Sequence, residues 1–309
     1  MITVLAGGFG AARFLRGLVR VVPAAEVTIV GNTGDDINIY GVHVCPDLDI
    51  VTFMLAGVLD ERRQFGLIGD TRVIMDELRA AGHDAWFDLG DRDYAICAAR
   101  SLWLQEGVPL HRAIERMTAR FDLETRLLPM TNEVVPTLIE TDDKTMHFQE
   151  YWVRHRAAPR VRAVHVGGGA PAPGVLDAIA EADVVIVAPS NPVVSIDPIL
   201  AVDGVRAALA ATRAPVVAIS PIVGGKVVRG MADKLLPAIG VPVSAAGVAG
   251  HYAGMLDGFI LDEVDAQEAA GIGVPARAVP AIMRTPEDAA ALAKQALDLA
   301  AQLRDAARP

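Results

Sequence analysis

Short apolar runs alternate with amphipathic stretches at both ends of the chain. Near the start, residues 2–6 predict a strand, residues 11–22 a helix and residues 27–30 a second strand. Strands interleaved with helices are typical of an α/β protein with a mostly parallel sheet. The same rhythm returns after residue 160, with strands expected at 163–166, 184–187, 216–219 and 259–261 and helices at 175–181, 205–211, 230–238, 246–256 and 286–306.

The middle of the chain has a different pattern, mostly helical from about residue 50 to residue 128. We predict helices at 50–59, 70–81, 93–106 and 110–120, one strand-like piece at 85–88, and a hairpin of 137–141 with 144–154. No repeat or flexible linker separates the two α/β segments. The sequence therefore predicts one α/β domain, residues 1–55 and 130–309, with a small helical insertion at residues 56–129.

The composition narrows the class of protein. The chain has 309 residues, 52% hydrophobic and 5% aromatic, which suits a parallel sheet covered by helices. A net charge of −10 argues against nucleic-acid and anionic-membrane partners. The two cysteines lack CxxC spacing, no signal-peptide pattern opens the sequence, and no apolar run reaches transmembrane length. We therefore expect a cytoplasmic protein with neither nucleic acid nor membrane as a partner.

A glycine-rich turn joins the first strand to the first helix. Gly7, Gly8 and Gly10 let the backbone approach a ligand closely, and Arg13 follows one turn into the helix. A helix N-terminus after such a turn favours an anion. The spacing matches neither the dinucleotide fingerprint nor the Walker A loop. The turn therefore predicts a phosphate site, and the alternative is a tight turn with an exposed arginine.

Carboxylates gather after the second strand. Asp35 and Asp36 end the segment 32–36, and Asp47 and Asp49 follow eleven residues later. Close carboxylates repel one another unless solvent or a cation relieves them. Oxygen ligands of this kind suit Mg²⁺. We predict that Asp35, Asp36 and Asp49 bind Mg²⁺, and the alternative is an acidic turn in which Asp35 or Asp36 caps a helix.

Two later strand ends also carry polar loops. Ser190 and Asn191 stand between prolines, so a rigid loop there presents donors and acceptors to a nucleotide, or it is only a stiff turn. Gly224, Gly225 and Lys226 resemble a second anion cradle in which Lys226 and Arg229 supply charge, and the alternative is a solvated lysine beside a turn. Two anion cradles and an acidic loop favour transfer chemistry on a phosphate or diphosphate.

Taken together, these stretches resemble the 2-phospho-L-lactate transferase family of coenzyme F420 biosynthesis, called CofD in archaea and FbiA in actinobacteria. The resemblance runs through nearly the whole chain in family order, and it is closer to the actinobacterial type. It is carried by residues 6–13, 32–36, 45–49, 86–93, 147–153, 188–195 and 220–226.

This resemblance implies a Rossmann-like α/β domain with a small helical subdomain, usually in a homodimer. It implies transfer of a phosphoenolpyruvyl or 2-phospho-L-lactyl group from a guanosine diphosphate-linked donor. The acceptor is the ribitol hydroxyl of the deazaflavin FO, GMP leaves, and Mg²⁺ is required. By the same resemblance we expect Asp49 to bind FO and to orient its hydroxyl, and Arg92 to hold the deazaflavin.

A second hypothesis comes from the YvcK-type branch of the same superfamily, which binds a nucleotide sugar without known catalysis of this kind. Members of that branch resemble one another in an Asp-Asp-Gly-Gly-Ser/Thr stretch after the second strand. This chain has Gly-Asp-Asp-Ile-Asn at 34–38 instead and keeps Pro-Asp-Leu-Asp at 46–49. The difference favours the enzyme.

Overall fold

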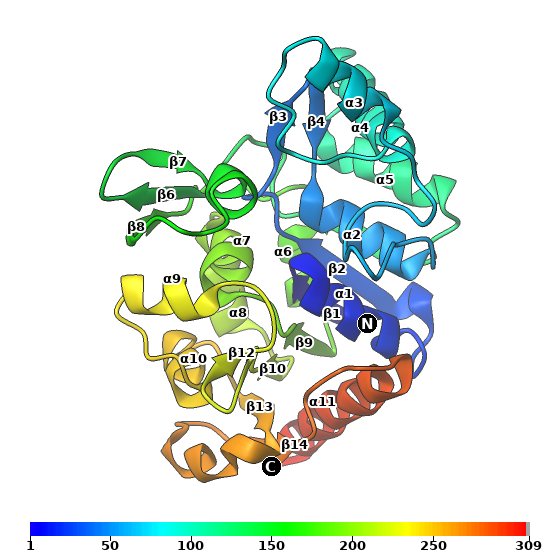
Figure 1. The fold of residues 1–309 in the computed structure, drawn as a ribbon. Coiled ribbons are helices and arrows are strands. Elements are labelled where there is room, and N and C mark those ends of the chain that lie inside the picture. Colours follow the sequence, from blue (N-terminus) through cyan, green and yellow to red (C-terminus); the bar gives the residue numbers. More distant parts are fainter. Residues whose placement is uncertain (307–309) are drawn as a thin grey trace.

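A computed structural model describes residues 1–306, and a seven-stranded sheet forms its centre (Figure 1). The strand order is β14-β13-β10-β9-β1-β2-β5, and every neighbouring pair is parallel. This confirms the predicted Rossmann-like α/β fold. The strands are β1 (Ile2–Ala6), β2 (Val27–Gly31), β5 (Arg126–Pro129), β9 (Val184–Val187), β10 (Val216–Ile219), β13 (Gly258–Asp262) and β14 (Ala276–Val279).

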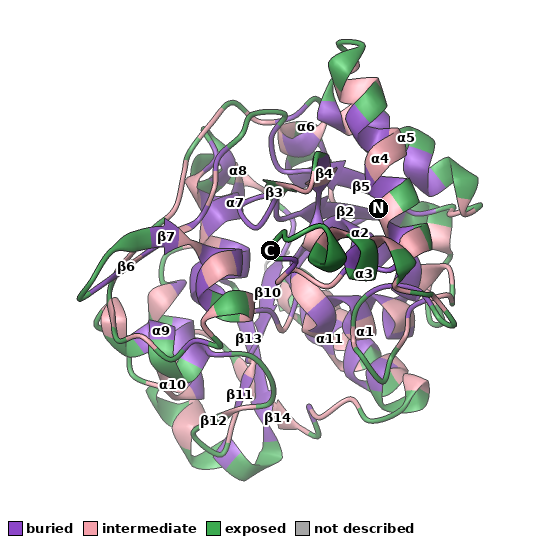
Figure 2. Ribbon diagram, turned by 45° about the horizontal axis from the view of Figure 1, so that its top comes forward, coloured by how far each residue is buried: buried purple, intermediate pink, exposed green. Residues whose placement is uncertain are grey.

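Helices cover both faces of the sheet, so its central strands are buried on both sides (Figure 2). Residues of β1 alternate between two cores, because successive side chains of a strand point to opposite faces. Val4 joins the core of one face and Leu5 that of the other. The Val4 face packs on α1 (Gly8–Leu18), α2 (Pro46–Leu55), α5 (Leu110–Arg120) and α11 (Pro286–Ala306), and the Leu5 face packs on α6 (Val175–Ala180), α7 (Asp197–Ala201), α8 (Val205–Ala211), α9 (Ala232–Ala238) and α10 (Ala245–His251).

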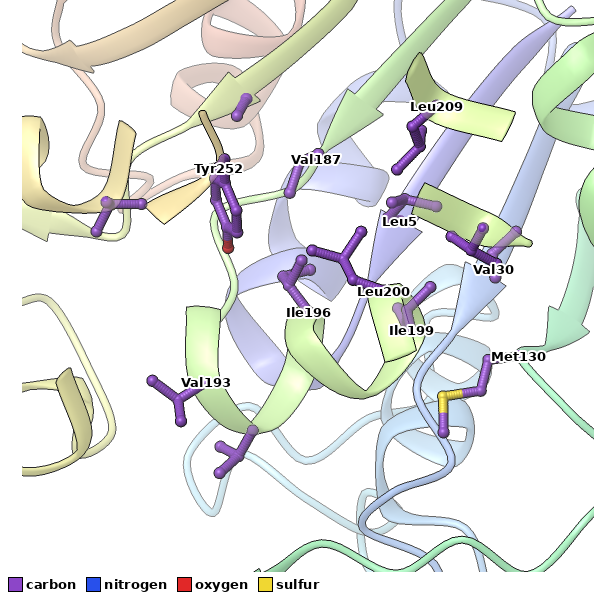
Figure 3. Close-up of a cluster of buried hydrophobic side chains, with 14 of the residues drawn as sticks. Leu5, Val30, Met130, Val187, Val193, Ile196, Ile199, Leu200, Leu209 and Tyr252 are labelled. Atoms are coloured by element: carbon purple, nitrogen blue, oxygen red, sulfur yellow. The ribbon is translucent and has the colours of Figure 1, made fainter. Parts of the chain in front are cut away.

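The Leu5 face shows how the polar loops are anchored. Leu5, Val30 and Val187 come from three neighbouring strands, and they face Ile199 and Leu200 of α7 (Figure 3). All five side chains are buried. The loop between β9 and α7 contains the predicted polar residues at 190 and 191. It is therefore fixed by apolar packing on both of its sides.

The segment after β2 forms a separate lobe on one end of the sheet (Figure 1). The hairpin of β3 (Ile37–Ile39) and β4 (Val42–Val44) packs on α3 (Val73–Ala80) and α4 (Asp91–Gln105) through its own small core. Residues 85–88 form no strand there, so that prediction was wrong. Residues 126–129, which we assigned to the helical insertion, form β5 of the main sheet instead.

A second, antiparallel sheet lies beside the main one. The expected hairpin is present as β6 (Leu138–Thr141) and β7 (Thr145–His147), and a short π-helix, η2 (Glu150–Arg154), follows it. Residues 163–166 were expected to form a strand of the main sheet. They lie instead at the end of β8 (Val161–His165), which pairs with β6. None of the helices within residues 1–306 has the length and apolar character needed to span a membrane.

Helix α1 and the C-terminal helix α11 cross at very close range. A Cβ placed on Gly17 would lie 2.2 Å from the backbone carbonyl carbon of Ala289. Real Cβ atoms do not approach backbone this closely, so only glycine permits the crossing. The contact fixes α1, whose first residues form the glycine-rich turn, against a helix about 270 residues away in sequence.

Candidate functional site

The glycine-rich turn lies where the strand order reverses. The chain passes from β1 to β2 on one side, whereas β9 lies on the other side of β1. Ligands of open α/β sheets bind at such switch points, outside the carboxyl ends of the strands. The Gly7 N–H donates to Ser190 Oγ at 3.3 Å, and a Cβ on Gly10 would lie 2.5 Å from Pro189 O. The structure therefore brings the first and third predicted loops together.

Asp47 lies directly against this turn. A Cβ on Gly7 would be 2.5 Å from Asp47 Oδ2 and 2.7 Å from Ser195 Cβ. Gly8 has a φ of +71°, a conformation that strains other residues. Asp47 begins α2 just after Pro46, where the positive end of the helix favours a carboxylate. The absence of side chains at the turn thus makes room for an acidic group.

Asn32 connects the carboxylates of this site. Its Nδ2 group donates to Asp47 Oδ2 at 2.9 Å, to Val194 O at 3.1 Å and to Asp35 Oδ1 at 3.2 Å. Its Oδ1 accepts from Gly34 N at 2.8 Å. The whole side chain is buried. Asn32 therefore holds two carboxylates of separate segments within reach of one amide.

Burial disfavours the ionised form of these carboxylates and so raises their pKa values. Burial, with the charge of Asp47 added, raises the pKa of Asp35 well above its ordinary value. Burial also raises the pKa of Asp47 to about 7, against the hydrogen bond from Asn32, and the charge of Asp36 raises it further. Buried carboxylates near one another either take up a proton or need a cation to stay ionised. We call Asp35, Asp36 and Asp47 the acidic patch.

Asp36 completes the acidic patch from the start of the β3–β4 hairpin. His43 Nε2 lies 3.3 Å from Asp36 Oδ2, and His147 Nε2 lies 3.1 Å from the Asp36 backbone oxygen. Asp36 Oδ1 is buried and has no hydrogen-bond partner among residues 1–306. Carboxylate oxygens are the ligands that Mg²⁺ prefers, and the donor atoms of Asp36, His43 and Cys45 all lie within 4.8 Å of one another.

Asp49 has a different environment. Arg100 of α4 donates to its two carboxylate oxygens at 2.9 and 2.7 Å, and Arg100 is fully buried. Burial raises the pKa of Asp49 to about 6, although the charge of Arg100 opposes the rise. Residues two apart on a helix point about 200° apart, so Asp47 and Asp49 face different sides of α2. Our choice of Asp49 as a metal ligand and catalytic residue stays a prediction, and the residue that meets the glycine-rich turn is Asp47.

The remaining predicted residues lie at the rim. Asn191 Oδ1 accepts from Val193 N at 3.0 Å and so caps the next helical turn. Gly224 and Gly225 form the tight turn between β11 (Ile222–Val223) and β12 (Lys226–Val227), where the Gly224 N–H already donates to Asp265. Lys226 and Arg92 are exposed side chains. Asn32, Arg100 and Gln149 were missed as site members from sequence, and Gln149 joins the site because its Nε2 donates to Asp35 Oδ2 at 3.1 Å.

Arg13 lies beside the glycine-rich turn as predicted, over the ring of Phe9. Its guanidinium carbon is 4.6 Å from the ring centroid, and Nη1 donates to Met283 O at 3.0 Å. Arg229, from the loop after β12, lies 4.4 Å from the same centroid. The sequence predicted Arg229 as a charged residue of the second anion cradle, together with Lys226. The site therefore has a cationic side as well as the acidic patch.

A pocket of about 600 Å³ borders the acidic patch. Thr33 and Asp36 form its inner wall, and the hairpin residues 38–43 close one side. Thr33 Oγ1 is buried without a hydrogen-bond partner in the described chain. The volume lies within the range of small-molecule sites, which are mostly apolar with a few polar groups. A ligand in this pocket would present its polar end to the carboxylates.

Comparison with known proteins identifies the family of this chain. The model of the family described as 2-phospho-L-lactate transferase CofD matches residues 2–273. A phosphoenolpyruvate transferase of Streptomyces griseus is 49% identical, with 98% of this chain and 99% of that protein covered. The phosphoenolpyruvate transferase of Thermobifida fusca is 48% identical, with coverage of 98% and 99%. A crystal structure of a UPF0052-family protein from Bacillus halodurans shares the fold, with a TM-score of 0.65 at 16% identity over 96% of this chain and 98% of that one. The chain belongs to the 2-phospho-L-lactate transferase CofD family.

Proposed function

We propose that this protein transfers a phosphoenolpyruvyl group, or a 2-phospho-L-lactyl group, from a guanosine diphosphate-linked donor to the ribitol hydroxyl of the deazaflavin FO. GMP is released, and the product is coenzyme F420-0 or its dehydro form. The names of the relatives support the enolpyruvyl donor. The observation that carries the proposal is the acidic patch against the glycine-rich turn at the switch point of the sheet.

Mg²⁺ fits this chain, because the acidic patch offers several carboxylate oxygens and one of them has no partner among the described residues. We propose that Asp35, Asp36 and Asp47 hold the ion. The ion would neutralise charge on the diphosphate and so favour displacement of GMP. Asp49 is a weaker candidate, since Arg100 already donates to both of its oxygens.

The reaction is a single in-line displacement. The terminal hydroxyl oxygen of FO bonds to the phosphorus distal to guanosine, the bond from that phosphorus to the GMP phosphate breaks, and the hydroxyl proton passes through a site carboxylate to water. We propose Asp49 as that carboxylate, because it is not among the proposed metal ligands and its pKa of about 6 suits a group that takes and releases a proton. The backbone of Gly7 and Gly8 positions the diphosphate, and positioning is most of what phosphoryl transfer requires.

The pocket beside Asp36 is the proposed place of the deazaflavin. It opens next to the acidic patch, so the ribitol chain can reach the carboxylates while the ring stays in the pocket. Arg92 at the start of α4 does not line this pocket, so its role at the deazaflavin stays a prediction. We also propose a homodimer in the cytoplasm, as the family resemblance implies, and sedimentation of the purified protein tests the dimer.

Incubation with FO, Mg²⁺ and each guanosine donor, followed by mass analysis, tests the proposal. We expect one FO-derived product that carries the transferred phosphoester, together with an equal amount of GMP. The competing hypothesis, a nucleotide-sugar-binding protein, predicts no FO-derived product and a nucleotide that is recovered unchanged. Either result decides between them.

A further inference from the structure

Two arginines share one aromatic ring at the edge of the site. Arg13 follows Phe9 by one turn of α1, and the loop from β12 to α9 brings Arg229 over the same ring. The guanidinium carbons lie 4.6 and 4.4 Å from the ring centroid. The two guanidinium carbons therefore lie at most about 9 Å apart, although 216 residues separate them in sequence.

No acid within residues 1–306 forms an ion pair with Arg13 or Arg229, although the charge of Glu61 acts on Arg13 from a distance. Arg13 donates only to a backbone oxygen, and its Nε is buried without a partner. The nearby acid, Glu61, is taken by Arg16 at 2.6 Å. Arg229 forms no ion pair within the described chain, and both burial and the charge of Arg13 lower its pKa, to about 10.

Such a pair is unfavourable without an anion. Like charges side by side repel, and a cation–π contact returns only about 0.5–1 kcal/mol for each arginine at an exposed site. A phosphoryl group placed between the two guanidinium forks would relieve the repulsion and accept several charged hydrogen bonds. The pair therefore has the charge and the hydrogen-bond donors of an anion-binding site.

The position of the arginine pair separates the positive charge of the site from the negative charge of the acidic patch. The acidic patch follows β2, whereas Arg229 follows β10, on the other side of β1 and β9 in the sheet. We infer that Arg13 and Arg229 together bind a phosphoryl group of the nucleoside diphosphate donor, across the glycine-rich turn from the acidic patch. This inference rests on the proposed function for the identity of the donor.

Titration of GDP into the full-length protein tests the inference without any turnover. We compare the wild type with Arg13→Gln and Arg229→Gln, and with Arg20→Gln as a matched control. Arg20 lies just beyond α1 and pairs with Glu287 at 3.1 Å at the surface. Loss of one charged hydrogen bond corresponds to about a 10- to 100-fold weaker affinity. We expect that loss in both test variants and less than a twofold change in the control.

The double variant and the melting temperature separate binding from a structural role. If both arginines bind the same phosphoryl group, the double variant should lose less GDP-binding free energy than the two single variants lose in total. Without ligand, Arg229→Gln should melt no lower than the wild type, since it removes a repulsion. Unchanged GDP affinity in Arg229→Gln would overturn the inference while the transfer reaction stands. A wild type that binds no GDP would overturn both.

Discussion

Substitution of Asp47 and of Asp49 by asparagine should change stability in opposite directions. Burial raises the pKa of Asp47 from an ordinary value of 3.8 to about 7. Each pKa unit corresponds to about 1.4 kcal/mol, so an ionised Asp47 destabilises the fold by up to about 4 kcal/mol at neutral pH. Asp47→Asn removes that charge and keeps an oxygen for Asn32. The variant should therefore be more stable than the wild type.

Asp49→Asn removes one partner of a buried ion pair. Arg100 is fully buried and is held by both Asp49 oxygens. Breaking a buried ion pair from one side leaves an uncompensated charge, at about 3–5 kcal/mol. This variant should be less stable than the wild type.

Urea unfolding in metal-free buffer at about pH 8 measures both effects. The sign also has a pH dependence. The folded pKa of Asp47 lies above the unfolded one, so wild-type stability falls as the pH rises from about 4 to about 7, and the advantage of Asp47→Asn grows over the same window. The transfer assay measures turnover independently of stability, and Asp47→Asn should lose turnover although it is more stable. If Asp47→Asn is destabilised, or if both variants shift in the same direction, the division of roles between the two residues is wrong.

Three further predictions concern the site. Chelation should abolish transfer and Mg²⁺ should restore it, and full turnover in excess chelator would exclude the ion. The apparent affinity for Mg²⁺ should rise with pH up to about 7 and then level off, because Asp47 must lose its proton to bind a cation; a flat titration profile would contradict this. Gly7→Ala should abolish GDP binding, since its Cβ would lie 2.5 Å from Asp47 Oδ2, whereas Gly273→Ala, which meets nothing within 4 Å, is the control.

The sequence predicted the strongly patterned elements to the residue. The helices expected at 110–120, 205–211 and 286–306 are α5, α8 and α11 with those bounds. Thr285 Oγ1 accepts from Asp288 N at 3.1 Å, which explains why the start of α11 was readable. The two strands that were missed, β5 and β14, lie at the edges of the sheet. Edge strands tolerate charge and proline, so their apolar pattern is weaker.

The candidate site was predictable only in part, for a geometric reason. The rule that parallel strands end on one edge was enough to bring Gly7 and Ser190 together. It could not decide between Asp47 and Asp49, because that choice depends on how α2 is rotated about its axis. Arg100 helps to set this rotation from another helix, 51 residues beyond Asp49. A contact of that range leaves no local signal in the sequence.

Because α1 crosses α11 at Gly17, a small tilt of α1 at this crossing would displace the N-terminal end of the helix. Gly17 lies nine residues from Gly8, about 14 Å along the axis at 1.5 Å per residue. A side chain at residue 17 would meet the backbone of Ala289, so α1 would have to tilt. A tilt of about 5° about this crossing point moves the glycine-rich turn by about 1 Å. A misplacement of that size can slow an enzyme about 100-fold. Residues of the last helix can therefore govern the rate of a reaction that none of them touches.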